Sequence, residues 1–294
     1  MTALAARWTR LPAPIRATAW MLVAAIGFSS MAMMIRTASF YFHPLEVGFF
    51  RSLFGGLLML PWVFRAGGQA LRTRRVGAHF ARSAVSVAAL FGYFTALAYI
   101  PLAEAAALTF TAPLFATVGA ALFLGEKVGL RRAAAVVIGF GGTLLILRPG
   151  SSTLSGPALL VLMSSAFVAG EMLLTKALAS TDRAETILFY MGVMVTPMAL
   201  GPALFFWTTP TLPGLAACLG VALAATLGHL GLARAFALAD ATAVMPLEFS
   251  KLIFAALLGY LAFSEVPSVW LWAGGAVILS AAVYNARHEA LARP

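Results

Sequence analysis

The sequence predicts an all-α integral membrane protein with ten transmembrane helices in two inverted five-helix repeats. Hydrophobic residues make up 62% of the 294 residues and charged residues 10%, and the mean hydropathy is +0.94. A soluble domain of this size could not cover its surface with so few charged side chains, so the chain must lie largely in lipid. An internal repeat and the placement of the basic residues complete the prediction.

Ten apolar stretches are each close to the roughly 20 residues that a helix needs to cross a bilayer. The first follows Arg7, Arg10 and Arg16, as a secretory signal would, but it is too long for a signal core and nine more spans follow, so we expect it to be retained. The predicted helices cover residues 15–36, 44–64, 77–100, 103–124, 130–148, 155–179, 184–207, 213–238, 241–263 and 267–286.

The basic residues set the predicted direction of these helices. With both termini in the cytoplasm, most of the 20 Lys and Arg fall in inner segments, whereas only Arg36 and Arg148 lie at outer ends. Arg51 and Lys251 lie within spans. The sequence therefore predicts a multi-pass protein of the inner (plasma) membrane. The net charge of +10 is dispersed among short loops with no stacking platform, so no nucleic-acid partner is expected.

The two halves of the chain match at an offset of about 139 residues. The string Leu122-Phe123-Leu124-Gly125-Glu126 recurs as Leu261-Ala262-Phe263-Ser264-Glu265, Arg36 matches Lys176, and Glu46 matches Glu185. We therefore divide the chain into repeats at 1–150 and 151–294. Because five spans is an odd number, the two copies must point in opposite directions through the membrane, as in many secondary transporters.

Two prolines predict interrupted helices in corresponding spans of the repeats. Pro113 lies within the fourth helix and Pro246 within the ninth. Proline removes a backbone donor and frees a carbonyl, so both helices should bend or break near the membrane interior. Such pairs commonly flank the binding site of inverted-repeat carriers, although a kink that only serves packing is an alternative.

Ionisable residues at membrane depth are costly and usually face the interior of the bundle. Glu248 and Lys251 lie three residues apart in the ninth helix, where they could neutralise each other or hold an ammonium and a carboxylate. Glu171 could contact substrate or pair with Lys176 or Lys251, and Arg51 could pair with Glu46. Glu171, Glu248 and His229 are the candidates for carrying a proton, with a packing role as the alternative for His229.

Hydroxyl and aromatic side chains complete the predicted substrate site. Hydroxyls beside Pro113 could contact either freed carbonyls or a ligand, and rings in a cavity would suit an aromatic substrate. The candidates are Ser86, Phe91, Tyr93, Phe94, Thr109, Thr111 and Phe167. Glycines in the fifth and tenth helices are expected at close helix contacts, namely Gly139, Gly141, Gly142, Gly274 and Gly275.

The ten spans and the closing string of each repeat resemble the drug/metabolite transporter superfamily and its EamA-type repeats. The residues that carry the resemblance are 101–108, 112–115, 122–126 and 258–265. It implies a secondary transporter that works by alternating access through a central cavity. Bacterial members similar to this chain export amino acids, aromatic ones included, so we expect export of small metabolites of that kind. A carrier of riboflavin or S-adenosylmethionine is the alternative.

Other classes of function find little support in the sequence. The four histidines are scattered over different segments, so no metal site or catalytic set is expected and the protein is not predicted to be an enzyme. The chain contains no motif for ATP, and no cofactor is expected. The expected partners are a small-molecule substrate and the lipid bilayer, while the oligomeric state stays open.

Overall fold

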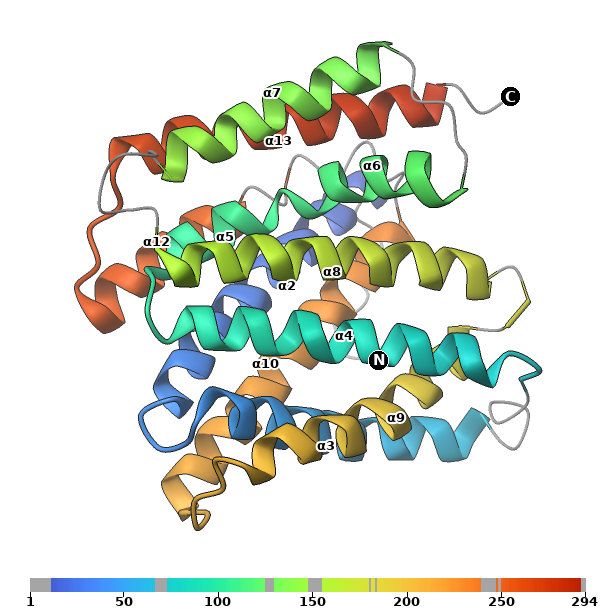
Figure 1. Cartoon of the computed structure of the whole chain (residues 1–294), viewed down its shortest axis with the longest axis vertical. Coiled ribbons are helices and arrows are strands. Elements are labelled where there is room, and N and C mark those ends of the chain that lie inside the picture. The colour runs from blue at the N-terminus through green and yellow to red at the C-terminus, as the bar shows by residue number, and fades with distance from the viewer. Residues whose placement is uncertain are drawn as a thin grey trace.

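The computed structural model describes residues 12–66, 73–124, 130–147, 155–179, 181–182, 184–238, 247 and 250–291. Within these ranges the regular structure is helical throughout, which confirms the predicted all-α class. The helices lie side by side in one bundle (Figure 1). They are α2 (Ala13–Ala38), α3 (Pro44–Ala66), α4 (Val76–Leu97), α5 (Leu102–Thr109), α6 (Ala112–Leu124), α7 (Leu130–Leu147), α8 (Gly156–Ala179), α9 (Ala184–Leu204), α10 (Leu212–Phe236), α12 (Ser250–Phe263) and α13 (Val269–Leu291).

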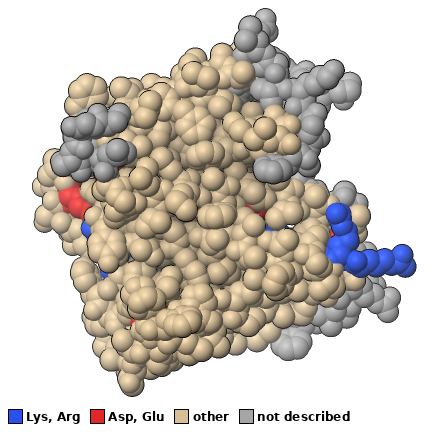
Figure 2. Space-filling model, viewed as in Figure 1, with Lys and Arg blue, Asp and Glu red and all other residues tan. Residues whose placement is uncertain are grey.

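The bundle has the dimensions and surface of a membrane protein. Five of the described segments are long and apolar enough to cross a bilayer: Ile15–Ala38, Val76–Leu97, Leu102–Gly119, Gly156–Thr175 and Leu212–Ala235. Large apolar side chains are exposed along the outside, and one face of the molecule is almost free of charged side chains (Figure 2). Water could not stabilise such a surface, whereas lipid tails match it.

The helix ends define two opposite faces of the bundle, which we name after a residue of each. The Arg36 face, on the left in Figure 1, carries the α2–α3, α4–α5 and α9–α10 connections. The Asp182 face, on the right, carries the beginnings of α4 and α9 and the end of α8. The membrane normal therefore runs from left to right in that view.

The packing of the first half is repeated in the second half with the partners exchanged. Helices α2, α4 and α6 of the first half correspond to α8, α10 and α12 of the second half. Accordingly α2 packs on α10 and α8 packs on α4, and α2 also packs on α12 whereas α8 also packs on α6. The remaining counterparts, α3 with α9 and α7 with α13, pack on each other. This pattern is unchanged when the two halves are swapped. It supports a division into two five-helix repeats, whose proposed boundary at residue 150 lies outside the described residues.

Glycines allow backbones to touch at two of these interfaces. A Cβ on Gly142 of α7 would lie 2.8 Å from the Gly274 carbonyl oxygen of α13, and a Cβ on Gly27 of α2 would lie 2.6 Å from the Gly228 nitrogen of α10. Close contact was expected for Gly142 and Gly274 and is confirmed. A Cβ on Gly141 would meet no described atom of the same chain within 4 Å, so the contact expected there is not made within the chain, and a contact between protomers stays a prediction.

The span predicted as one helix over residues 103–124 is two helices, α5 and α6, separated at Phe110 and Thr111. The Phe110 and Thr111 amides bond three residues back, to the Ala107 and Leu108 carbonyls. Because proline has no N–H, Pro113 fits the first turn of α6, where no intrahelical donor is required. Of the described candidate spans, Leu102–Gly119 is the most buried, at 61%. The break therefore lies in the interior of the bundle.

Candidate transport site

The break between α5 and α6 is lined by hydroxyl groups. The Thr109 hydroxyl donates to the Ala106 carbonyl and the Thr111 hydroxyl to the Leu108 carbonyl, each at 2.7 Å. Ser165 of α8 also donates to the Leu108 carbonyl, at 3.4 Å. These hydroxyls add donors to two carbonyls of the last turn of α5, and the Leu108 carbonyl also accepts from the Thr111 amide, so both carbonyls are paired at the break.

Lys251 of α12 reaches this break from the other half of the chain. Its ammonium donates to the Thr109 hydroxyl at 3.2 Å and lies 4.7 Å from the centre of the Phe110 ring. Ser29 of α2 donates to the Lys251 carbonyl at 3.0 Å. A cation, a hydroxyl and a buried aromatic ring therefore meet where α12 of the second half of the chain touches the end of α5 in the first half.

A second polar group lies between α4 and α8, closer to the Asp182 face. Arg82 contacts Glu171 at 2.7 Å and donates from Nε to the Thr175 hydroxyl at 2.7 Å. Arg51 of α3 lies near enough to interact electrostatically with Glu171. Glu171 therefore has the basic partner expected from the sequence, but that partner is Arg82 and not one of the two lysines named above, of which the Lys176 side chain lies outside the described part of the chain. Sequence reasoning missed Arg82 because it counted this residue among the loop charges.

Glu46 has a structural role at the start of α3. Its carboxylate is fully buried and accepts from the His43 amide at 2.9 Å and the Thr208 amide at 2.8 Å. The bond to His43 is one half of a capping box, in which a residue of the first turn satisfies the amide before the helix. The sequence suggested that Glu46 could pair with Arg51. The structure instead gives the Glu46 carboxylate these backbone partners.

The other candidates occupy varied positions. Thr111 and Phe94 are buried, Phe91 and Tyr93 are partly buried, and the Ser86 hydroxyl has no hydrogen-bond partner in the described part of the chain. Phe167 is 38% exposed on α8, and the His229 ring packs edge-on against Phe28 with centroids 5.1 Å apart. Glu248 and Pro246 lie outside the described residues.

The Arg36 face contains a charged cluster that joins three elements, which we call the Glu265 cluster. Glu265 pairs with Arg36 of α2 through one oxygen and accepts from the Leu102 amide, at the start of α5, through the other at 2.8 Å. The Arg36 guanidinium lies 4.9 Å from the centre of the Phe263 ring. The two charged side chains are only 17% and 13% exposed, so water screens the pair weakly.

The turn after α12 aims Glu265 into this cluster. Ser264 has a φ of 57°, a left-handed conformation, and its amide donates to the Tyr260 carbonyl at 3.0 Å. The Glu265 amide donates to the Gly259 carbonyl at 3.2 Å, so the chain turns back over the last turn of α12. A Cβ on Gly259 would lie 2.5 Å from Glu265 Oε2, so glycine leaves room for the carboxylate. The repeated Glu of the sequence was the available indication of this cluster.

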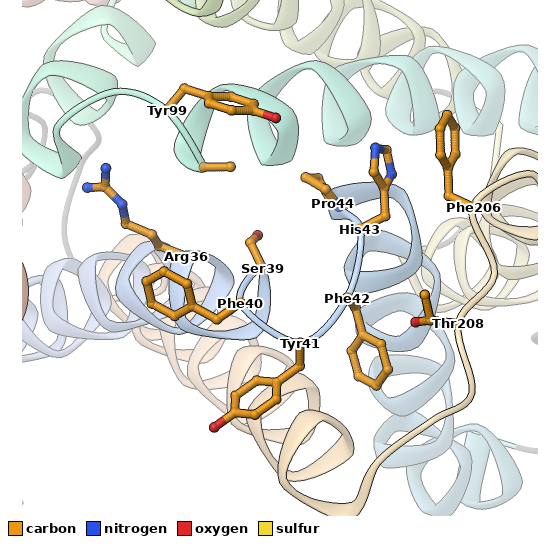
Figure 3. Close-up of a pocket in the computed structure, with 11 residues that line it drawn as sticks. Arg36, Ser39, Phe40, Tyr41, Phe42, His43, Pro44, Tyr99, Phe206 and Thr208 are labelled. Carbon is orange, nitrogen blue, oxygen red and sulfur yellow. The ribbon is translucent and has the colours of Figure 1, made fainter.

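A pocket of about 530 Å³ opens beside the Glu265 cluster on the Arg36 face. Figure 3 shows Arg36, Ser39, Tyr99 and His43 around its middle, while the rings of Phe40, Tyr41 and Phe42 point away from it. The His43 ring stacks on Phe206 at 3.9 Å between centroids. The pocket, which we call the Tyr99 pocket, therefore combines a cation, hydroxyls and flat ring surfaces.

The Asp182 face is tied together by a separate carboxylate. Asp182 accepts from the Thr73 hydroxyl at 2.6 Å and contacts His79 Nε2 at 2.7 Å. The Thr73 hydrogen bond and, after it, the interactions with His79 hold the pKa of Asp182 below its usual value, against the opposing effect of burial. Among the described residues, no group of three His, Cys, Asp or Glu side chains could hold a metal ion.

A family model matches the first half of the chain, and individual relatives align with nearly all of it. Residues 15–148 match the EamA-like transporter family. A riboflavin transporter of Rhizobium johnstonii is 36% identical over 273 residues, which cover 92% of this chain and 90% of the relative. The chain belongs to the EamA-like transporter family. This EamA chain is also 32% identical to the pseudopaline exporter CntI of Pseudomonas aeruginosa, over 90% of this chain and 94% of the relative.

A more distant relative and a solved structure are consistent with membership of this family. An S-adenosylmethionine uptake transporter of Rickettsia bellii is 26% identical over 90% of this chain and 91% of its own length. One crystal structure aligns over 92% of this chain and 97% of its own with a TM-score of 0.57 at 19% identity, which supports the fold. The protein is thus a multi-pass membrane transporter of the drug/metabolite transporter superfamily and not an enzyme.

Proposed function

We propose that this EamA transporter carries riboflavin, or a metabolite with a comparable flat heteroaromatic ring, through the membrane by alternating access. The observation that carries the proposal is the similarity along nearly the full chain to proteins named as riboflavin transporters. The contact between Lys251, Thr109 and Phe110 suits such a ring. Phe110 is only 4% exposed and Lys251 lies over its ring, so a substrate ring would enter this contact as the two halves move apart, and the Lys251 ammonium would then donate to a ring carbonyl.

The position of this contact supports alternating access. It lies at the broken span and joins α12 of the second half to α5 of the first half. In inverted-repeat carriers the substrate lies between the repeats at discontinuous helices, and the repeats move around it. With the Arg36 face outward, the basic residues of the chain follow the positive-inside rule, so both termini would lie in the cytoplasm of a cell whose inner membrane holds the protein.

Reconstituted vesicles test the proposed substrate. Protein-containing vesicles loaded with unlabelled riboflavin should accumulate labelled riboflavin by exchange, and empty vesicles should not. Thr109→Val removes the hydroxyl that faces Lys251, so we expect a rise in KM of about tenfold from the loss of one hydrogen bond to a charged group. Thr111→Val is the matched control. It makes the same chemical change two residues further on, where the hydroxyl donates to the Leu108 carbonyl, whereas the Thr109 hydroxyl accepts from Lys251. Absence of exchange would refute the riboflavin assignment.

Amino-acid export, the expectation from sequence, is the second candidate function. The ammonium of Lys251 would attract a substrate carboxylate, and a relative named as the pseudopaline exporter is 32% identical to this chain. The same vesicles distinguish the two candidates when labelled aromatic amino acids replace riboflavin. Exchange of amino acids that riboflavin does not inhibit would favour this second function.

Glu171 is the acid that we propose for proton coupling. Its carboxylate pairs with Arg82 across the α4–α8 interface, so protonation would weaken a contact between the two repeats. Glu171→Gln should abolish any dependence of flux on a pH gradient. A variant that kept the full dependence would exclude Glu171 and leave Glu248 and His229 to be tested in the same way.

A further inference from the structure

The Glu265 cluster and the central contact are linked by two short helices. Helix α5 has Leu102 in the cluster at one end and Thr109 at the centre at the other. Helix α12 has Lys251 at its central end, and Glu265 follows its last residue after a single turn residue, Ser264. At 1.5 Å per residue, the eight residues of α5 form a rod of about 12 Å. Because α5 and α12 also pack on each other, the Glu265 cluster and the central contact lie at opposite ends of one pair of packed helices.

Arg36 belongs to both the Glu265 cluster and the Tyr99 pocket. Its guanidinium pairs with Glu265, and Arg36 is also one of the residues that line the pocket, where Figure 3 shows it at the edge away from His43. A guanidinium has five donors in a flat fork and can bind oxygen atoms of a ligand in the same way as a carboxylate. A ligand oxygen in the pocket would therefore compete with Glu265 for Arg36.

The other groups of the pocket suit the same flat ligand. Tyr99 is 68% exposed and its hydroxyl points toward the middle of the pocket, opposite Ser39. His43 lies at the far side, held parallel to Phe206 at an interplanar angle of 9°. Rings and hydroxyls around one cation recognise a flat ring that carries carbonyl groups on its edge.

We propose that the Tyr99 pocket is a second binding site for the transported ring, and that ligand oxygens bound by Arg36 release Glu265 and open the α2–α5–α12 contact on this face. The proposal rests on riboflavin-type transport for the identity of its ligand. In this proposal Arg36 is a positioning residue for the central site, because it acts on that site through Glu265 and α5. The site would receive substrate before, or after, it occupies the centre.

Two cysteine reporters test the proposal, with the single native cysteine removed by Cys218→Ala. Ser39→Cys places a thiol in the Tyr99 pocket, and a charged maleimide is applied to sealed vesicles from each side in turn. Saturating riboflavin should slow the reaction of this thiol about tenfold. Phe205→Cys, exposed at the same face but not part of the pocket, should react at an unchanged rate. Ser39→Cys that reacts equally fast with and without riboflavin would overturn the site.

The second reporter measures the opening itself. Ser29 is 1% exposed and bonds the Lys251 carbonyl, so Ser29→Cys reports access to the centre. Adding Glu265→Gln keeps an acceptor for the Leu102 amide but removes the charge, which should speed labelling from the Arg36 face about tenfold. Asp182→Asn, in a carboxylate group of the opposite face, is the control and should not change the rate from the Arg36 face.

The reporters separate failure of this proposal from failure of the proposed function. Labelling of Ser29→Cys that Glu265→Gln does not change would overturn the coupling, whatever the substrate. Riboflavin exchange in vesicles without protection of Ser39→Cys would overturn only the pocket. Absence of riboflavin exchange, together with faster labelling in Glu265→Gln, would retain the coupling and reject riboflavin as the ligand.

Discussion

The contact between α7 and α13 gives a sharp test of the packing, because two adjacent glycines differ in what surrounds them. A Cβ on Gly142 would lie 2.8 Å from the Gly274 carbonyl oxygen and 2.9 Å from Ile278 Cγ1. A Cβ on Gly141 would meet no atom within 4 Å. Gly142→Ala and Gly141→Ala therefore make the same chemical change in the same helix, with and without a neighbouring backbone.

The expected difference follows from these distances. Carbon atoms pack at about 3.5 Å, so Gly142→Ala must move the helices apart by roughly 0.7 Å. Overpacking of this kind costs about 1–3 kcal/mol, and the helix propensity of alanine returns about 0.5–1 kcal/mol. Both variants gain the helix propensity of alanine but only Gly142→Ala is overpacked, so its free energy of unfolding should be lower than that of Gly141→Ala by about 1–3 kcal/mol.

Reversible unfolding in mixed lipid and detergent micelles measures both variants. We expect Gly142→Ala to unfold at a lower denaturant concentration than the wild type. Gly274→Ala should behave in the same way, because a Cβ on Gly274 would lie 2.5 Å from the Gly142 carbonyl oxygen. Equal stability of Gly141→Ala and Gly142→Ala would refute the backbone contact between α7 and α13.

Three further predictions concern the helix ends. Ser264→Gly should raise the free energy of unfolding by about 0.5–1 kcal/mol. The change removes a left-handed strain of about 1–2 kcal/mol from the folded state, and the greater freedom of glycine in the unfolded chain offsets part of this gain. A lower Tm would contradict the left-handed φ of Ser264. Gly259→Ala should displace the Glu265 carboxylate, so labelling of the centre should rise as in Glu265→Gln, and unchanged labelling would argue against the contact. Asp182→Asn should lower Tm at pH 7. The pKa of Asp182 is depressed in the folded state, so its stabilisation is present above the unfolded pKa, about 3.8, and is lost as pH falls through the lower folded pKa; the difference in Tm should close below pH 3.8, and a constant difference would contradict it.

The membrane class and the interrupted fourth span could be predicted because lipid leaves few solutions for an apolar chain. Composition alone excludes a soluble surface, and Pro113 cannot continue a helix that begins at Leu102. The sequence also placed Lys251 and Thr109 in corresponding spans of the two halves. Their contact follows because those spans face each other in the bundle.

The ion-pair partners could not be predicted, since they depend on which helices become neighbours. Glu171 has Lys176 close in sequence, yet α8 packs on α4 and presents this carboxylate to Arg82. Glu265 was recognised only as a repeated residue, because its partner Arg36 lies in a helix of the other repeat. Spacing along one helix identifies its own face, and it contains no information about the helix opposite.

The exchange of packing partners has a consequence for how the protein is made. The side of α2 that will be covered by α10 has no partner while the first half is being synthesised, and it stays uncovered until Leu212–Phe236 has been inserted. Contacts between segments far apart in sequence form late and slowly. During translation, lipid or an insertion factor must therefore shield Gly27 and its neighbours, and a ribosome that stops after the first repeat would leave in the membrane a half-bundle with open helix faces, which quality-control proteases could recognise.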